Sequence, residues 1–146
     1  MKGDVVKLRE ETGAGVMECK KAFDEAKGDF EKAKQIIAER AVMKADSKKE
    51  RKTGTGFLHS YIHNERVGVL LEVRCETDFV ARSDAFQEMV HELALHIAAM
   101  GPENVSSLLS SPFVKDESIT VSDFIKGTIA KTGENINIER FARFEV

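Results

Sequence analysis

The sequence predicts an α+β protein in which a small helical bundle precedes a core built on an antiparallel sheet. Over residues 3–43, apolar side chains recur every three or four positions, which is the period of an amphipathic helix. From residue 57 onward they alternate every second position and later return to helical spacing, so both strands and helices are expected. We therefore expect a helical bundle at 1–43, a basic linker at 44–56 and an α+β core at 57–146.

The bundle is predicted to contain three short helices with one apolar face each. A glycine turn at Thr12–Gly15 separates the first two helices, and Gly28-Asp29 supplies a stop and an N-cap before the third. Faces of this size bury only a minimal core, of the kind found in ubiquitin-associated-like domains. The residues assigned to the three faces are Val5, Val6 and Leu8, then Val16, Cys19, Ala22, Phe23 and Ala26, then Phe30, Ala33, Ile36 and Ile37.

The core is predicted to combine strands with amphipathic helices, beginning with a β-hairpin that turns at 63–66. A three-stranded sheet leaves open edges, and a symmetric dimer is one way to cover them. The expected elements are strands at 57–62 and 67–73, a turn at Asp78-Phe79, a helix from Phe86 to Ile97 that stops at Gly101-Pro102, a loop at 106–111, a helix at 121–129, and a last strand through Ile136 and Ile138 that ends near Phe144.

The composition predicts a soluble, reduced protein. The chain is 42% hydrophobic and 32% charged, and its apolar runs are far shorter than the roughly 18 residues that span a membrane. Cys19 and Cys75 are too few and too far apart in sequence for a disulfide framework or a zinc knuckle. Since no secretory signal is visible after Met1, we expect a cytoplasmic location and no membrane partner.

The net charge of −3 is distributed unevenly. Residues 1–52 carry 14 Lys+Arg and 11 Asp+Glu, whereas residues 53–146 carry 8 and 14. The acidic second part argues against nucleic acid as its main partner. The basic excess peaks at Lys44–Lys52, which is either a solvated linker or an arm that helps to dock an acidic surface.

Motifs for catalysis or ligand binding are weak. The glycine pairs Gly13–Gly15 and Gly54–Gly56 lack the Lys-Ser or Lys-Thr that a phosphate-binding loop requires. His59 and His63 could share one strand face, but a metal site would need Cys75 as a third ligand. Cys75 could also act as a nucleophile beside a histidine, although a thiol at the end of an apolar strand is usually inert. We expect no catalytic residue, no metal and no cofactor.

The most informative segment is Val67–Arg82, which places an acidic residue and a large aromatic side by side after an apolar strand. The pattern alone leaves two interpretations of Phe79 open. Its ring either packs back onto the helix that contains Phe86 or projects outward into another protein. At the start of the second helix, Val16 fits the buried face, whereas Met17 falls outside it and suits partner contact.

Four motifs resemble those of bacterial elongation factor Ts. CETDFVAR at 75–82 and TGAGVMECKKAFDEAKGD at 12–29 resemble the two signatures of that family. GENINI at 133–138 and PFVKD at 112–116 extend the likeness over nearly the whole chain. Members of this family exchange guanine nucleotide on elongation factor Tu, a translational GTPase, and are not enzymes in the bond-making sense.

The resemblance implies that this chain releases GDP from elongation factor Tu. The aspartate-phenylalanine pair of the family corresponds to Asp78-Phe79, whose aromatic ring would enter the GTPase near its magnesium-binding and phosphate-binding elements. The resemblance also assigns partner contacts to Val16, Met17 and Lys20 in the bundle, Lys48 in the basic linker, His63 in the hairpin, Phe113 and Val114 in the PFV segment, and Thr132 with Gly133 after the last helix.

The chain also departs from the family pattern. Longer members have two related core lobes and an inserted helical hairpin, whereas only eleven residues separate Met100 from Pro112 here. The single lobe of this chain therefore combines two features that longer members divide between their lobes, the aspartate-phenylalanine motif and the histidine hairpin. The resemblance thus implies a homodimer, in which two copies pair where long members use two lobes. At Lys115, moreover, some members have an apolar residue.

Two other functional interpretations stay open. The chain could bind the GTPase, or another helical surface, without altering the dwell time of GDP. Alternatively, it could be a small cysteine hydrolase that acts through Cys75, which alkylation of the thiol would reveal.

Overall fold

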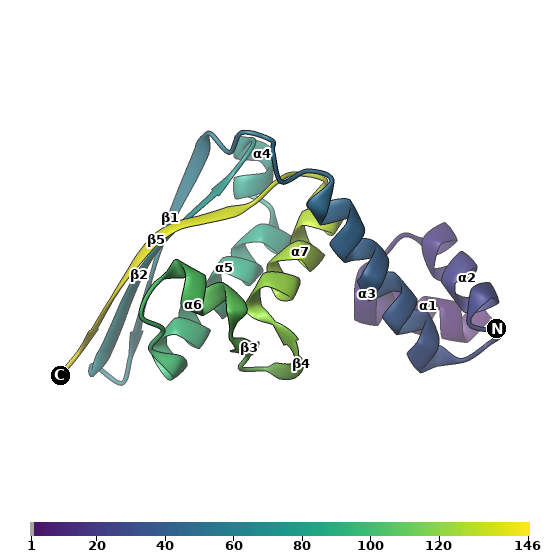
Figure 1. Cartoon of the computed structure of the whole chain (residues 1–146), viewed down its shortest axis with the longest axis horizontal. Coiled ribbons are helices and arrows are strands. Elements are labelled where there is room, and N and C mark those ends of the chain that lie inside the picture. The colour runs from purple at the N-terminus through teal and green to yellow at the C-terminus, as the bar shows by residue number, and fades with distance from the viewer. Residues whose placement is uncertain (1) are drawn as a thin grey trace.

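A computed structural model describes residues 2–146 and shows a helical bundle connected to an α+β core by one long helix (Figure 1). The bundle contains α1 (Lys2–Thr12), α2 (Val16–Glu25) and α3 (Phe30–Asp46). The side chain of Asp29 caps α3 by accepting a hydrogen bond from the Lys32 amide. The small bundle core is formed by Leu8, Cys19, Ala22, Phe23, Ala26, Ala33 and Ile37. The predicted three-helix start of the chain is confirmed.

The core is built on a three-stranded antiparallel sheet in the order β1-β2-β5. Its strands are β1 (Thr55–His63), β2 (Val67–Cys75) and β5 (Asn137–Glu145). The hairpin between β1 and β2 turns through Asn64 and Glu65, both with positive φ, as the tight turns of hairpins require. These observations confirm the predicted α+β class with a small antiparallel sheet.

Helices cover one face of the sheet (Figure 1). α5 (Asp84–Met100) packs against β1 and β2 and presents Phe86, Met89, Leu93 and Ile97 to the core. α5 ends where predicted, at Gly101, which adopts a left-handed conformation. α7 (Val121–Thr132) is capped at its start by Thr120 through a reciprocal capping box. It packs between α5 and α3.

Three local predictions need correction. The expected turn at Asp78 is a one-turn helix, α4 (Asp78–Ala81), because the Thr77 hydroxyl caps it. The expected loop at 106–111 contains α6 (Val105–Ser110), which Asn104 caps and Leu108 anchors in the core. The PFV segment forms a small hairpin, β3 (Pro112–Phe113) with β4 (Asp116–Thr120), that the sequence pattern did not indicate.

The irregular stretch between the bundle and the sheet is shorter than the expected 44–56. α3 continues through Asp46 because Ala45 is buried in the core cluster beside α7. At the other end, Thr55 and Gly56 already pair with Cys75 and Arg74 in the sheet. How the chain divides into domains stays a prediction.

Candidate protein-binding surfaces

Phe79 lies on the short helix α4 and points away from the core. Thr77 starts this helix, and its hydroxyl accepts a hydrogen bond from the Val80 amide at 3.3 Å. Val80 and Ala81 are buried, so the opposite side of the helix is left to Asp78 and Phe79. The Phe79 ring is 82% exposed, whereas Phe86 is fully buried and packs edge-to-face with Phe57. The interpretation in which Phe79 packs onto α5 is therefore wrong.

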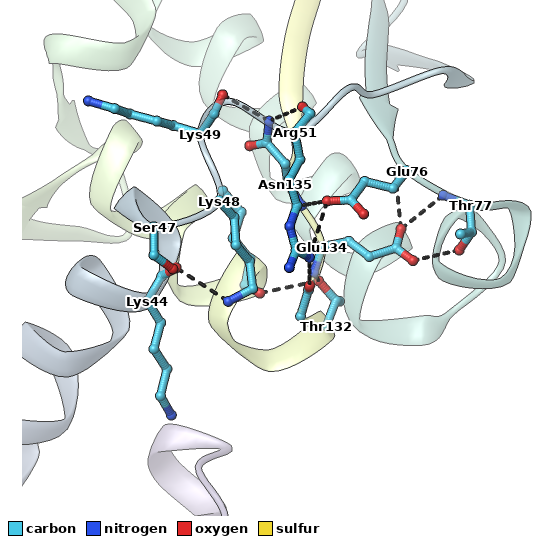
Figure 2. Close-up of polar contacts among 12 residues, drawn as sticks. Lys44, Ser47, Lys48, Lys49, Arg51, Glu76, Thr77, Thr132, Glu134 and Asn135 are labelled. Atoms are coloured by element: carbon cyan, nitrogen blue, oxygen red, sulfur yellow. Dashed lines mark hydrogen bonds and ion pairs between the residues drawn. The ribbon is translucent and has the colours of Figure 1, made fainter.

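The turn after α7 and the segment after α3 lie at the same end of the core as α4 (Figure 2). Gly133 closes α7 in a left-handed conformation, and its carbonyl accepts a hydrogen bond from Arg51. The Lys48 ammonium donates a hydrogen bond to the carbonyl of Lys44, one turn earlier in the chain. Three of the assigned contact segments, those of Phe79, Lys48 and Thr132-Gly133, are thus brought together.

The start of α2 forms a separate apolar surface on the bundle. Val16 and Met17 are 49% and 64% exposed, and Lys20 beside them is also exposed. The assignment of Val16 to the buried face is a wrong prediction, because Cys19, Ala22 and Phe23 already fill the side of α2 that faces α1 and α3. Both apolar side chains are therefore available to a partner.

His63 lies at the opposite end of the sheet from Phe79. Thr55 pairs with Cys75 near α4, whereas His63 pairs with Val67 at the far end of the same nine-residue ladder. At about 3.4 Å per residue, the two ends are separated by roughly 27 Å. The His63 ring contacts the Tyr61 hydroxyl at 2.8 Å and the Asn64 amide at 3.2 Å. One chain therefore presents Phe79 and the histidine hairpin at two distant places.

The PFV segment presents only one of its two assigned side chains. The Phe113 ring is 4% exposed and stacks on Phe124 at 4.2 Å and on His96 at 5.9 Å. Its assignment as a contact side chain needs correction, since it anchors the hairpin from inside. Val114 is 40% exposed and remains available, and the Lys115 ammonium next to it pairs with Glu92 at 2.7 Å.

The geometry does not support the cysteine or metal interpretations. The Cys75 thiol is buried and donates to the Thr77 carbonyl at 3.3 Å. Burial raises the pKa of Cys75, and the nearby Glu134 carboxylate adds to this rise, so the reactive thiolate is disfavoured. The His59 ring contacts the His91 ring at 3.2 Å. Within residues 2–146, no group of three or more His, Cys, Asp or Glu side chains could hold a metal ion.

The outer face of the sheet is an apolar surface that the sequence reasoning missed. Leu58 and Ile62 from β1, Leu70 from β2 and Phe144 from β5 are between 47% and 78% exposed. We call these four residues the outer patch. Glu72 lies beside it on the same face and binds both Arg74 and Arg140. The sequence does contain a pattern that indicates this surface, because both the inward-facing and the outward-facing positions of β1 and β2 include apolar residues.

A cleft of about 590 Å³ separates the bundle from the core. It is lined by the Thr12–Gly15 turn, α3, β4 and α7. The side chain of Lys131 from α7 lies across Gly13 and closes one part of the cleft. None of the described helices combines the length and the apolar character that crossing a membrane requires.

Exposed apolar side chains on two separate parts of one small chain are typical of a factor that binds other proteins. A family model described as Elongation factor TS matches residues 76–146. Curated relatives cover nearly the whole chain, and on that basis the chain belongs to the elongation factor Ts family.

The relatives are longer than this chain. It is 41% identical to "Elongation factor Ts" of Coprothermobacter proteolyticus, over 96% of this chain and 94% of the relative. It is 39% identical to that of Thermosipho melanesiensis, over 97% and 96%, and 40% identical to that of Gloeothece citriformis, over 96% and 65%. The first alignment runs over 186 positions against 146 residues here, so at least 40 positions have no counterpart in this chain.

Proposed function

We propose that this chain is a guanine nucleotide exchange factor that promotes the release of GDP from elongation factor Tu. The observation that supports this proposal most directly is the 82% exposure of Phe79, on a helix whose other side is anchored in the core. An aromatic ring held outward in this way can enter a partner without unfolding its own domain. Family membership supplies the identity of the partner.

The proposed mechanism is displacement of the elements that hold magnesium and phosphate in the GTPase. A bound Mg²⁺ ion is a major counter-charge for the diphosphate, so its disturbance lowers the affinity for GDP. Val16 and Met17 would bind the nucleotide-binding domain of the GTPase, while Phe79 enters beside the metal. No covalent bond is made or broken by the exchange factor.

Thermodynamic linkage gives the proposal a second test. If binding of this chain weakens GDP by some factor, GDP must weaken binding of this chain by the same factor. Efficient exchange requires a coupling free energy above the typical range of about 1–3 kcal/mol. Nucleotide-free elongation factor Tu should therefore bind this chain most tightly, and the GDP-bound form less tightly.

The first prediction concerns Phe79. The Phe79→Ala variant should slow the release of fluorescent GDP from elongation factor Tu at least ~10-fold, because the side chain that displaces the metal-binding elements is removed. Stopped-flow mixing measures this rate. Met100→Ala is the control, since Met100 is also an exposed apolar residue of the core, and it should leave the rate unchanged. If GDP release with Phe79→Ala were as fast as with the wild type, the proposed mechanism would be contradicted.

A second candidate function is binding of the same GTPase without nucleotide exchange. The shortness of the chain relative to its relatives favours this alternative, because at least 40 positions of the first alignment have no counterpart here. It predicts a complex whose GDP dwell time equals that of the free GTPase, so the wild-type protein in the same stopped-flow experiment separates the two.

We further propose that the active form is a homodimer that pairs through the outer patch. The patch occupies the sheet face that the described helices leave open (Figure 1). Carboxylate and guanidinium groups lie together beside it, so a two-fold axis can place opposite charges across the interface. Such a dimer would place the Phe79 helix of one copy and the His63 hairpin of the other within reach of one GTPase.

A further inference from the structure

Glu134 is bound to the start of the helix that carries Phe79. Its Oε1 atom accepts hydrogen bonds from the amides of Glu76 at 3.1 Å and Thr77 at 2.9 Å. Its Oε2 atom accepts from the Thr77 hydroxyl at 2.6 Å. Figure 2 shows this carboxylate reaching from the turn after α7 to Thr77. One side chain thus satisfies three donors on a segment 57 or more residues away in sequence.

The Thr77 hydroxyl connects this carboxylate to α4 itself. The same hydroxyl that donates to Glu134 also accepts from the Val80 amide and so caps the helix. A helix of four residues is far below the length that is stable alone, so its orientation depends on its cap and on Val80 and Ala81 in the core. Phe79 is the second residue of this helix, and the fixed cap therefore determines where its ring points.

The turn that contains Glu134 is itself held from both sides. The Glu76 carboxylate accepts from the Asn135 amide at 2.9 Å, which makes the contact between the two segments reciprocal. Arg51 donates to the carbonyl of Gly133 at 3.2 Å and lies 3.7 Å from the Glu76 carboxylate. Because charge-assisted hydrogen bonds are stronger than neutral ones, this arrangement fixes Glu134 more firmly than a loop contact would.

We propose that Glu134 is a positioning residue for nucleotide exchange, which holds Phe79 in its outward orientation through the Thr77 cap. This inference rests on the exchange function proposed above. Glu134 does not need to touch the GTPase for this role, since it acts through Thr77. The alternative is a structural role, in which Glu134 contributes only to the stability of the core.

Three variants separate these roles in stopped-flow GDP release over a range of exchanger concentrations. Glu134→Ala should lower the maximal rate roughly 10-fold or more, because a small misplacement of a reacting group is costly. Its half-saturating concentration should change less than about twofold, because the bundle still binds. Glu134→Gln keeps an acceptor for the two amides and should retain most of the rate. Glu103→Ala removes an exposed carboxylate after α5 and is the control.

The double variant Phe79→Ala/Glu134→Ala decides whether Glu134 acts through the ring. If it does, the second substitution should add no further loss once Phe79 is absent. The inference would be overturned if Glu134→Ala lowered the maximal rate by the same factor in the wild type and in Phe79→Ala. It would also be overturned if Glu134→Ala alone released GDP at the wild-type rate. A wild-type rate for Phe79→Ala would instead overturn the exchange mechanism itself. If Glu134→Ala does not fold, Thr77→Val replaces it in the same comparison. This variant exchanges the hydroxyl for a methyl group and so removes both its bond to Glu134 and its bond from the Val80 amide.

Discussion

At the residue scale, His96 shows how a buried polar side chain supports an exposed segment. The ring is fully buried, and its Nδ1 atom accepts a hydrogen bond from the Val114 amide at 3.1 Å. Its Nε2 atom must then carry the proton and donates to the Ser111 hydroxyl, also at 3.1 Å. The bond from Val114 requires the neutral ring, since protonation of Nδ1 would remove its acceptor, whereas Nε2 donates to Ser111 in either state.

This geometry predicts the pH dependence of folding. Burial lowers the pKa of His96 below its ordinary value of 6.5. As the pH falls below 6.5, the unfolded chain therefore binds more protons than the folded one. The contribution of His96 to stability is full above pH 6.5 and is lost as the pH falls through the lower pKa of the folded state. The free energy of unfolding should decrease from pH 7.5 to pH 5, as thermal or urea unfolding measures.

Substitution separates His96 from the other histidines. His96→Gln removes the titrating group and should flatten the pH dependence, although not abolish it, because burial and His91 also lower the pKa of His59. His63→Gln is the control, as this exposed residue lies at the end of β1, before the hairpin turn. Equal pH dependence of the wild type and His96→Gln would show that another group is responsible.

At the element scale, the sequence predicted long, periodic segments and missed short ones that depend on single contacts. The helices of the bundle, α5, α7 and the β1–β2 hairpin follow from apolar spacing and turn residues. α4 and α6 have too few residues for a period, and each forms because a polar side chain caps it and one or two apolar residues are buried. The exposure of Phe79 follows from the same anchoring, so the pattern alone left it open.

The segment between α3 and β1 is another element that tertiary contacts define. The Asn135 side chain is 3% exposed, and its Nδ2 atom donates to the carbonyls of Lys49 at 3.3 Å and Arg51 at 2.8 Å (Figure 2). These bonds hold the basic segment against the turn after α7. The sequence showed only its charge, which is compatible with either a free linker or a docked one.

Removal of this amide should release the segment. Asn135→Ala leaves two carbonyls without their donor and should destabilise the protein by about 1–3 kcal/mol. Trypsin should then cleave faster in the basic stretch 48–52, since local opening exposes it. Asn137→Ala is the control, because it removes one exposed bond to Thr53 and should have a smaller effect. Equal cleavage of the two variants would mean that Asn135 does not hold the segment.

At the scale of the whole molecule, the side chains predicted to contact a partner do not form one continuous surface. The start of α2 lies on the bundle, Phe79 lies at one end of the sheet, and His63 lies at the other end, roughly 27 Å away by strand geometry. Because Phe79 and His63 lie at opposite ends of the three-stranded sheet, a single chain cannot bring them together. The outer patch lies on the sheet between them, so pairing of two copies there would link the two ends through one interface.

Leu70 provides the test of this arrangement, because it lies on the central strand, opposite Ser60 and Ala142. A charge there would be buried without a partner if two patches pack together, so Leu70→Glu should convert a dimer into a monomer. Light scattering at tens of micromolar measures the mass. Met43→Glu, at an exposed apolar site on α3 outside the patch, should stay dimeric. The monomer should need a higher concentration for half-maximal GDP release, because the partner's histidine hairpin is lost, while Phe79 keeps its orientation. A wild-type protein that is monomeric at this concentration, or a Leu70→Glu variant that remains dimeric, would contradict pairing through the outer patch.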